Sequence, residues 1–222
     1  MPGEIVHPKA AAPMPVSTDS LVLADFVELQ PGQRIVDLGS GTGAVALTLA
    51  GREKISVVGF DNCMEAVEEA QRRLERDKSL LVGTCRFEAG DLRNEAFVRS
   101  LGVFDQVVCN PPYYKVGHGR LPPNPSRASA RFETTCTLDD VVCAASWALA
   151  PGGAFSFTLI PARLGEALSL LTKHGFAPNA LQPVYTRRRR DAERVLIRAA
   201  LGVNGSLRLL PPRQLRALSE DG

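Results

Sequence analysis

The sequence has no long apolar run and none of the features that mark export. No stretch approaches the roughly 18 consecutive apolar residues that cross a bilayer. The first residues, MPGEIVHPKAAAPMPV, do not combine a charged start with an apolar core, so we expect no signal peptide. These absences predict a protein without membrane contact and, by default, a cytoplasmic one.

Metal-ligand and disulfide patterns are also missing. The five cysteines are odd in number and never form Cys-x-x-Cys, and the three histidines are far apart in the sequence. We therefore expect no metal site, and free cysteines that act as small core residues. The cysteines are Cys63, Cys85, Cys109, Cys136 and Cys143.

A strong overall charge is absent too, because the net charge is only +2. The charge is nevertheless uneven. Residues 187–222 hold nine Arg and four acidic residues, and residues 113–133 hold four bases and one acid. Such asymmetry suggests a polyanionic partner on one face. A solvated charged surface is the alternative, and charge alone favours it.

The chain of 222 residues is long enough for one large α/β domain with a sizeable core. We expect an N-terminal extension over 1–16, a single domain over 17–210 and a C-terminal tail over 211–222. No internal repeat is present.

Hydrophobic periodicity predicts alternating strands and helices. The predicted strands are 34–38, 55–60, 83–91, 104–110, 154–160, 181–186 and 194–201. The predicted helices are 17–29, 44–50, 62–77, 137–150 and 164–175, and 111–136 is a long loop. The alternation indicates a doubly wound, mostly parallel seven-stranded sheet with helices on both faces. Its last two strands follow each other directly, so one strand near the edge should be reversed.

The segment VDLGSGTGAV, residues 36–45, reads as strand, glycines and helix. Glycines let a backbone approach a ligand, and a helix N-terminus offers free N–H groups. The pattern alone also satisfies a loose dinucleotide fingerprint. Asp37 at the end of the strand favours a cationic ligand over a pyrophosphate, because a carboxylate there should face the ligand. S-adenosylmethionine, with its sulfonium and ammonium groups, fits this requirement.

Two more acids follow the next two strands. Asp61 could accept hydrogen bonds from both hydroxyls of a ribose, or it could cap the helix 62–77. Asp91 could bind the amino group of an adenine, or it could be a turn residue. Three acids after three successive strands favour a binding site over three separate structural roles.

The stretch VVCNPPYY ends the fourth predicted strand. In a doubly wound sheet, ligands lie at the carboxyl ends of the strands, beside the switch in strand order. The Asn110 side-chain oxygen and the Pro111 carbonyl could hold the two N–H groups of an exocyclic amine in line with a methyl donor. Tyr113 could stack on a base that is swung out of its strand. A Pro-stabilised turn is the alternative.

These motifs resemble class I S-adenosylmethionine-dependent amino-methyltransferases, whose signature is Asn-Pro-Pro-Tyr. The chain is most similar to the bacterial family that methylates an adenine N6 in the anticodon loop of a valine tRNA. The similarity also lies in STDSLVLADF, in the stretch 126–149, and in VYTRRRRDAERVLIRAALG with LRLLPP. The resemblance implies a Rossmann-like class I methyltransferase fold, S-adenosyl-L-methionine as cofactor and tRNA as partner.

The resemblance and the residues around the motifs give a predicted site. The catalytic set is Asn110, Pro111, Pro112 and Tyr113. The cofactor set is Asp37, Gly39, Ser40, Gly41, Thr42, Gly43, Asp61, Asn62, Asp91, Leu92 and Asn110. The RNA-binding set is Arg120, Arg127, Arg131, Arg187, Arg188, Arg189 and Arg190.

Two other functions remain open at this point. Glutamine N5-methylation of a protein poses the same chemical problem, because an amide nitrogen is also a poor nucleophile. About 30 residues precede the first strand, which leaves little room for the helical domain of release-factor methyltransferases. A nonenzymatic module that binds RNA or the cofactor is the third reading.

Overall fold

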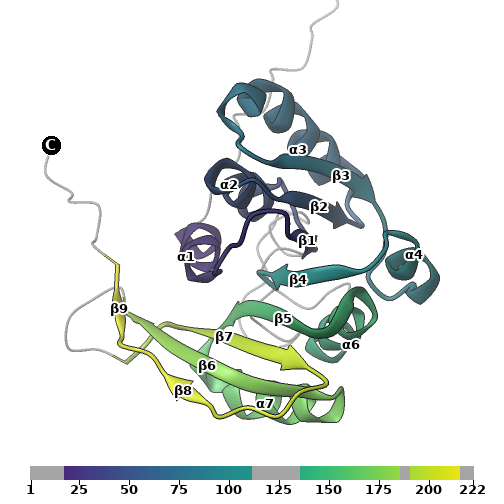
Figure 1. Cartoon of the computed structure of the whole chain (residues 1–222). Helices are drawn as coiled ribbons and strands as arrows, with labels where there is room; N and C mark the ends of the chain where they lie inside the picture. Colours follow the sequence, from purple (N-terminus) through teal and green to yellow (C-terminus); the bar gives the residue numbers. More distant parts are fainter. Residues whose placement is uncertain (1–17, 112–135, 186–190, 216–222) are drawn as a thin grey trace, which may run out of the picture.

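The computed structural model describes residues 18–111, 136–185 and 191–215. One sheet runs through the molecule, in the order β3-β2-β1-β4-β5-β7-β6-β8, and β9 also pairs with β6 (Figure 1). The strands are β1 (Arg34–Leu38), β2 (Ser56–Asp61), β3 (Thr84–Ala89), β4 (Phe104–Cys109), β5 (Leu149–Leu159), β6 (Phe176–Tyr185), β7 (Arg194–Leu201), β8 (Arg208–Leu209) and β9 (Arg213–Gln214).

Strand directions confirm the doubly wound sheet with one reversed strand. β3, β2, β1, β4 and β5 pair in parallel, and β7 runs antiparallel to both β5 and β6. All seven predicted strands are present. The predicted number of strands was too low, however, because β8 and β9 add two strands of two residues each. Strands this short carry no readable alternation, and β9 falls within residues 211–222.

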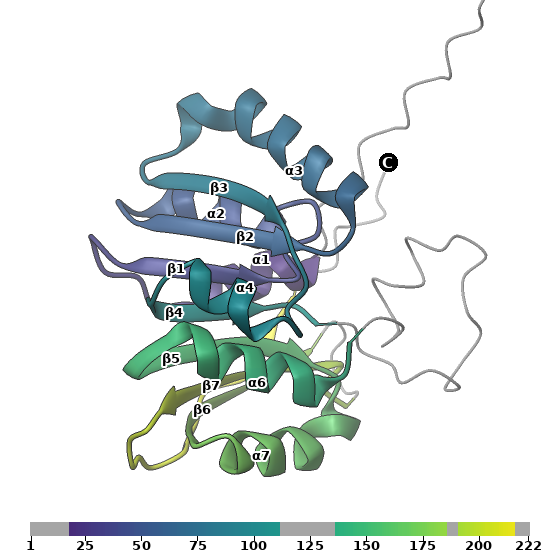
Figure 2. The ribbon, with the colours of Figure 1, turned by 90° about the vertical axis from the view of Figure 1, so that its right-hand side faces the viewer.

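Helices cover both faces of the sheet, as predicted (Figure 2). The buried residues of α1, α2 and α3 share one core cluster, and those of α4, α6 and α7 share the other. The helices are α1 (Thr18–Phe26), α2 (Ala44–Arg52), α3 (Met64–Asp77), α4 (Glu95–Ser100), α6 (Leu138–Ala148) and α7 (Leu164–Lys173), with 3-10 turns η1 (Lys78–Leu80) and η2 (Pro161–Arg163). The short α4 was not predicted.

Two local features concern the ion pairs on α3 and the start of β5. On α3, Arg72 and Arg73 pair with acidic side chains one turn earlier. Pro151, Gly152 and Gly153 fall between the predicted helix 137–150 and the predicted strand 154–160. They instead lie inside β5, which starts at Leu149, and the pairing with β4 shifts register there.

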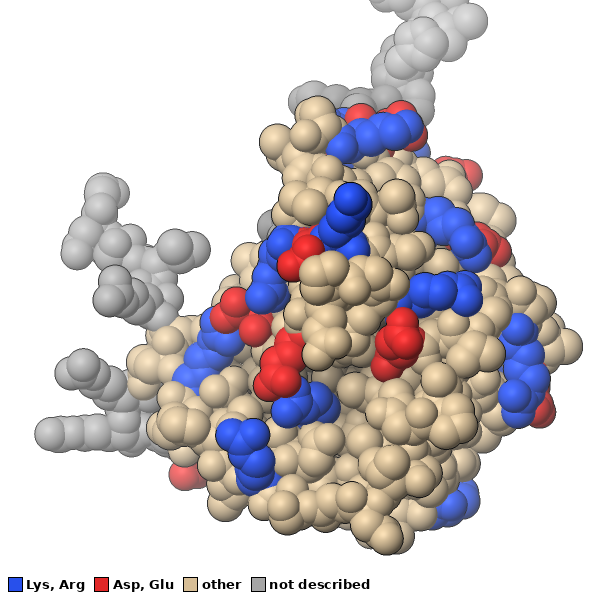
Figure 3. Space-filling view, viewed as in Figure 1, with Lys and Arg blue, Asp and Glu red and all other residues tan. Residues whose placement is uncertain are grey.

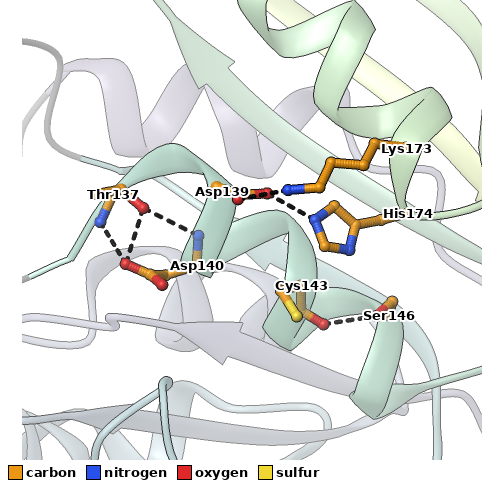
Figure 4. A network of polar contacts seen from close by, with 7 residues as sticks. All are labelled: Thr137, Asp139, Asp140, Cys143, Ser146, Lys173 and His174. Carbon is orange, nitrogen blue, oxygen red and sulfur yellow. Dashed lines mark hydrogen bonds and ion pairs between the residues drawn. The ribbon is translucent and has the colours of Figure 1, made fainter.

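Figure 4 shows how α6 begins and how α7 ends beside it. Thr137 and Asp140 form the capping box: the Thr137 hydroxyl accepts from the Asp140 N–H, and the Thr137 N–H donates to the Asp140 carboxylate at 2.8 Å. Asp139 binds Lys173 Nζ at 2.7 Å and lies 2.6 Å from His174 Nε2. These contacts tie the start of α6 to the end of α7.

Candidate active site

The order of the strands places the predicted site residues at one edge of the sheet. β1 lies between β2 and β4. The chain adds β2 and β3 on one side of β1 and then crosses over to add β4 and β5 on the other side, so the strand order reverses at β1. Asp37 on β1 is in register with Gly59 on β2 and with Val108 on β4. The glycine loop, Asp61 and Asn110 therefore all leave the sheet at this switch point, where doubly wound folds bind ligands.

The glycine loop, residues 39–43, presents its backbone to open space. Gly39, Gly41 and Gly43 have φ angles of 64°, 53° and 80°, a left-handed conformation that favours glycine. A Cβ atom on Gly39 or Gly41 would meet no atom of the described residues within 4 Å. The Ser40 N–H donates to the Phe60 carbonyl at 2.9 Å, which attaches the loop to β2. A ligand can therefore approach the main chain at this loop.

Asp37 is buried next to the start of α2, and the prediction from the sequence that its carboxylate faces the ligand stays a prediction. Its side chain is buried, and its Oδ2 accepts a hydrogen bond from the Ala46 N–H of α2 at 3.2 Å. Burial raises the pKa of Asp37 to about 8, although the Ala46 N–H works in the opposite direction and nearby Asp61 adds to the rise. A cation bound above the loop would favour the ionised carboxylate.

Asp61 connects the loop to the next helix. One carboxylate oxygen accepts from the Gly41 N–H and the other from the Cys63 N–H, both at 2.9 Å. The α3 helix begins at Met64 with Cys63 as its N-cap, which makes no side-chain capping bond. Asp61 is thus not the N-cap residue of α3, but it accepts a hydrogen bond in the turn just before that helix. Its other carboxylate oxygen fixes the position of the glycine loop.

Asp91 adopts the turn role that was its alternative. Its carboxylate binds the Arg93 side chain, with the shortest distance 2.6 Å, and accepts from the Arg93 N–H at 2.9 Å. These bonds to Arg93 lower the pKa of Asp91. The neighbouring Leu92 is partly buried against the core. A contact between Asp91 and the cofactor remains a prediction.

Asn110 is held by a residue that the sequence did not single out. Its Nδ2 donates to Ser20 Oγ on α1 at 3.2 Å, although the two residues are 90 positions apart. Pro111 is buried directly after it. Pro112 and Tyr113 lie outside the described residues. The segment around Ser20 was recognised as part of a family resemblance, but nothing local indicated a contact with Asn110.

Phe87 on β3 is a second residue that the sequence did not identify. Its ring lies so close to Gly43 and Gly59 that a Cβ on either glycine would come within 2.5 Å and 2.6 Å of ring atoms. Gly43 is the N-cap of α2 and Gly59 lies on β2. The Phe87 ring therefore packs under the glycine loop, and it leaves no room for a side chain at Gly43 or Gly59.

The predicted RNA-binding arginines all lie outside the described residues. On the face seen in Figure 3, Lys and Arg alternate with Asp and Glu and form no continuous basic surface among the residues described. Several arginines of the described residues are ion-paired, such as Arg93 with Asp91 and Arg99 with Glu95. A basic face around the site remains a prediction.

Known proteins resemble this chain along most of its length. The model of the methyltransferase small domain family matches residues 15–163. The chain belongs to this family. This membership confirms the reaction class predicted from the sequence, methyl transfer, and S-adenosylmethionine as the methyl donor.

The curated relatives of this methyltransferase chain are more specific. The tRNA1(Val) (adenine(37)-N6)-methyltransferase of Vibrio vulnificus (strain YJ016) is 30% identical over 85% of this chain and 76% of its own. The enzyme of the same name from Shewanella loihica is 28% identical over 83% and 75%. These matches confirm the family resemblance seen in the motifs.

A solved structure supports the fold of this methyltransferase. A predicted O-methyltransferase from Agrobacterium tumefaciens superimposes with a TM-score of 0.71, covers 92% of this chain and 90% of its own, and is 24% identical. The Rossmann-like class I methyltransferase fold is thus confirmed.

The residues of the site fit S-adenosylmethionine. Among the described residues, the space above Gly39 and Gly41 is open, and the side chains of Asp37 and Asp61 lie beside the loop, where a bound cation would favour the ionised form of Asp37. In residues 18–111, 136–185 and 191–215, no three side chains of His, Cys, Asp or Glu gather as metal ligands. Across the same part of the chain, no helix has both the length and the apolar character needed to cross a membrane.

Proposed function

We propose that this methyltransferase modifies the exocyclic N6 amine of an adenine in the anticodon loop of a tRNA, in the cytoplasm. The observation that carries the proposal is the position of Asn110 and Pro111 after β4, at the switch point beside the glycine loop. The relatives named tRNA1(Val) (adenine(37)-N6)-methyltransferase support the choice of an adenine in tRNA.

Methyl transfer to an adenine N6 requires hydrogen-bond acceptors for the amine more than it requires a general base. The lone pair of an adenine N6 is delocalised into the ring, so the amine is a weak nucleophile. The Asn110 side-chain oxygen and the Pro111 carbonyl accept its two N–H groups, aim the nitrogen and stabilise the positive charge that develops on it. The amine loses a proton after the transfer, so no general base is needed beforehand. Bound S-adenosylmethionine supplies the methyl group and leaves as a neutral thioether.

Pro112 and Tyr113 complete the proposed motif, with Tyr113 stacking on the extruded base. The arginines of the predicted RNA-binding set, which follow Asn110 and β6 in the chain, would contact RNA phosphates. β5 and β6 both run antiparallel to β7, so the carboxyl end of β6 lies at the same edge as Asn110. Residues 187–190 follow that end in the chain, which supports their place beside the substrate.

The first test is methyl transfer from labelled S-adenosylmethionine to unmodified total tRNA, with a protein lysate and a no-substrate reaction alongside. We expect label in N6-methyladenosine. Asn110→Ala should lower kcat by about 10²-fold or more, the cost of losing one group that stabilises the charge of a transition state, and should still bind the cofactor. Label in protein in place of tRNA would replace the proposal with glutamine methylation. Cofactor binding without label in any substrate would also contradict it.

A further inference from the structure

Ser20 and Asn110 join the first described helix to the end of β4. The Asn110 amide nitrogen donates to Ser20 Oγ at 3.2 Å, and Ser20 is only 8% exposed. An amide group is planar, with its nitrogen and oxygen on opposite sides of the Cγ atom. A donor bond from the nitrogen to Ser20 therefore turns the oxygen away from α1.

The position of Ser20 is itself fixed by contacts along α1. Gln106, near the start of β4, donates to the Glu28 carbonyl just beyond α1 at 2.8 Å. The helix is thus hydrogen-bonded to the same strand near both of its ends. Leu23 and Ala24 are fully buried in the core between these two bonds. The helix cannot shift along β4 without breaking this packing.

Ion pairs hold α1 to β7 as well. Asp19 binds Arg194 at the start of β7 at 3.2 Å, and both side chains are about a quarter exposed. Beyond the helix end, Glu28 binds Arg198 on β7 at 2.8 Å. The residue next to Ser20 is therefore anchored to a strand other than β4, which fixes the direction from which the hydroxyl meets Asn110.

We propose that Ser20 is a positioning residue, which holds the Asn110 amide so that its oxygen, and not its nitrogen, faces the target amine. This role rests on the proposed function. An amide rotated by 180° would present N–H groups to the adenine amine and repel it. The cost should therefore appear in the transfer step and not in cofactor binding.

The test compares three variants with the wild type. Ser20→Ala removes the hydroxyl and Ser20→Thr keeps it. Ser156→Ala is the matched control, because the Ser156 hydroxyl is also buried, on β5, but has no hydrogen-bond partner among the residues that the structure describes. We expect Ser20→Ala to lower kcat about tenfold, the usual cost of one lost hydrogen bond, with an unchanged Kd for S-adenosylmethionine. Ser20→Thr should recover most of the rate, and Ser156→Ala should match the wild type.

A second measurement does not depend on activity. In ¹⁵N-labelled wild-type protein, the Asn110 side-chain amide, assigned by its loss in Asn110→Asp, should exchange slowly with solvent. Rapid exchange in the wild type would overturn the assignment. So would a Ser20→Ala enzyme with wild-type kcat, a loss confined to cofactor affinity, or a folded Ser20→Thr no faster than Ser20→Ala. A wild-type enzyme that methylates no adenine would overturn the proposed function and, with it, this role.

Discussion

At the scale of single residues, Asp37 combines a cost in folding stability with a predicted role in ligand binding. It is buried under the glycine loop, and its pKa is raised to about 8. In the unfolded chain the carboxyl group ionises near pH 3.9. Between these two values the unfolded state loses its proton while the folded state keeps it. The free energy of unfolding should therefore decrease as pH rises through this range, and the full loss is present above pH 8.

Asp37→Asn should remove this pH dependence. A shift of about four pKa units corresponds to about 5 kcal/mol, as an order of magnitude. Asn still accepts the Ala46 N–H but carries no proton to lose. We expect the cofactor-free variant to equal the wild type near pH 4 and to exceed it in stability at pH 8, in denaturant unfolding at both values.

The same substitution should weaken binding of the cationic cofactor. Titration calorimetry at pH 7 in two buffers of different ionisation enthalpy should show proton release when the wild type binds S-adenosylmethionine, and none for Asp37→Asn. Equal proton release in both proteins would mean that Asp37 does not ionise on binding.

At the scale of elements, the packing of β2 and β3 supports the loop that follows β1. The Phe87 ring on β3 is buried and lies against Gly59 of β2 and against Gly43, where α2 begins. Sequence patterns predicted both strands and the loop, because alternation and glycine spacing are local signals. They could not predict the packing of Phe87 against Gly43 and Gly59, because these glycines lie on two other elements.

Gly59→Ala tests this support. The new Cβ would lie 2.6 Å from the Phe87 ring and 2.9 Å from Ser40 Cβ, so the ring and the loop must move. We expect a loss of about 1–3 kcal/mol in unfolding free energy, together with weaker cofactor binding.

Gly165→Ala on α7 is the matched control for this prediction. Its Cβ would meet nothing within 4 Å, and alanine favours a helix. Thermal melting and cofactor titration should separate the two variants. A Gly59→Ala protein as stable as Gly165→Ala would show that Phe87 moves at no cost.

At the scale of the whole molecule, the sequence predicted the order and direction of the main strands better than it predicted the short elements. The last two predicted strands had too little chain between them for a crossover, which indicated the reversed β7. The two-residue strands β8 and β9 and the six-residue α4 were missed because each is too short to repeat its period several times. The Ser20–Asn110 contact was also missed, because it depends on how α1 folds across the sheet.

Charge is the whole-molecule property that should govern RNA binding. Replacing Arg187, Arg188, Arg189 and Arg190 with Gln should weaken tRNA binding, most strongly at low salt. If all four contact phosphates, the slope of log K against log salt should become shallower by about three.

The control for this prediction replaces Arg72 and Arg76 on α3 with Gln. Both side chains are exposed and already paired with acidic residues. Filter binding of tRNA over a series of salt concentrations measures both variants. Equal slopes for the two would mean that the four arginines are only a solvated surface.

The anchoring of α1 also has a consequence for synthesis on the ribosome. The helix leaves the exit tunnel well before Arg194, Arg198 and Arg213, which pair with α1 or with Glu28 just beyond it. A nascent chain that has already formed β1, β4 and the glycine loop still lacks these ion pairs. In a chain stopped before residue 194, α1 should therefore be held less firmly against Asn110, and we expect lower activity than in a chain that includes the three arginines.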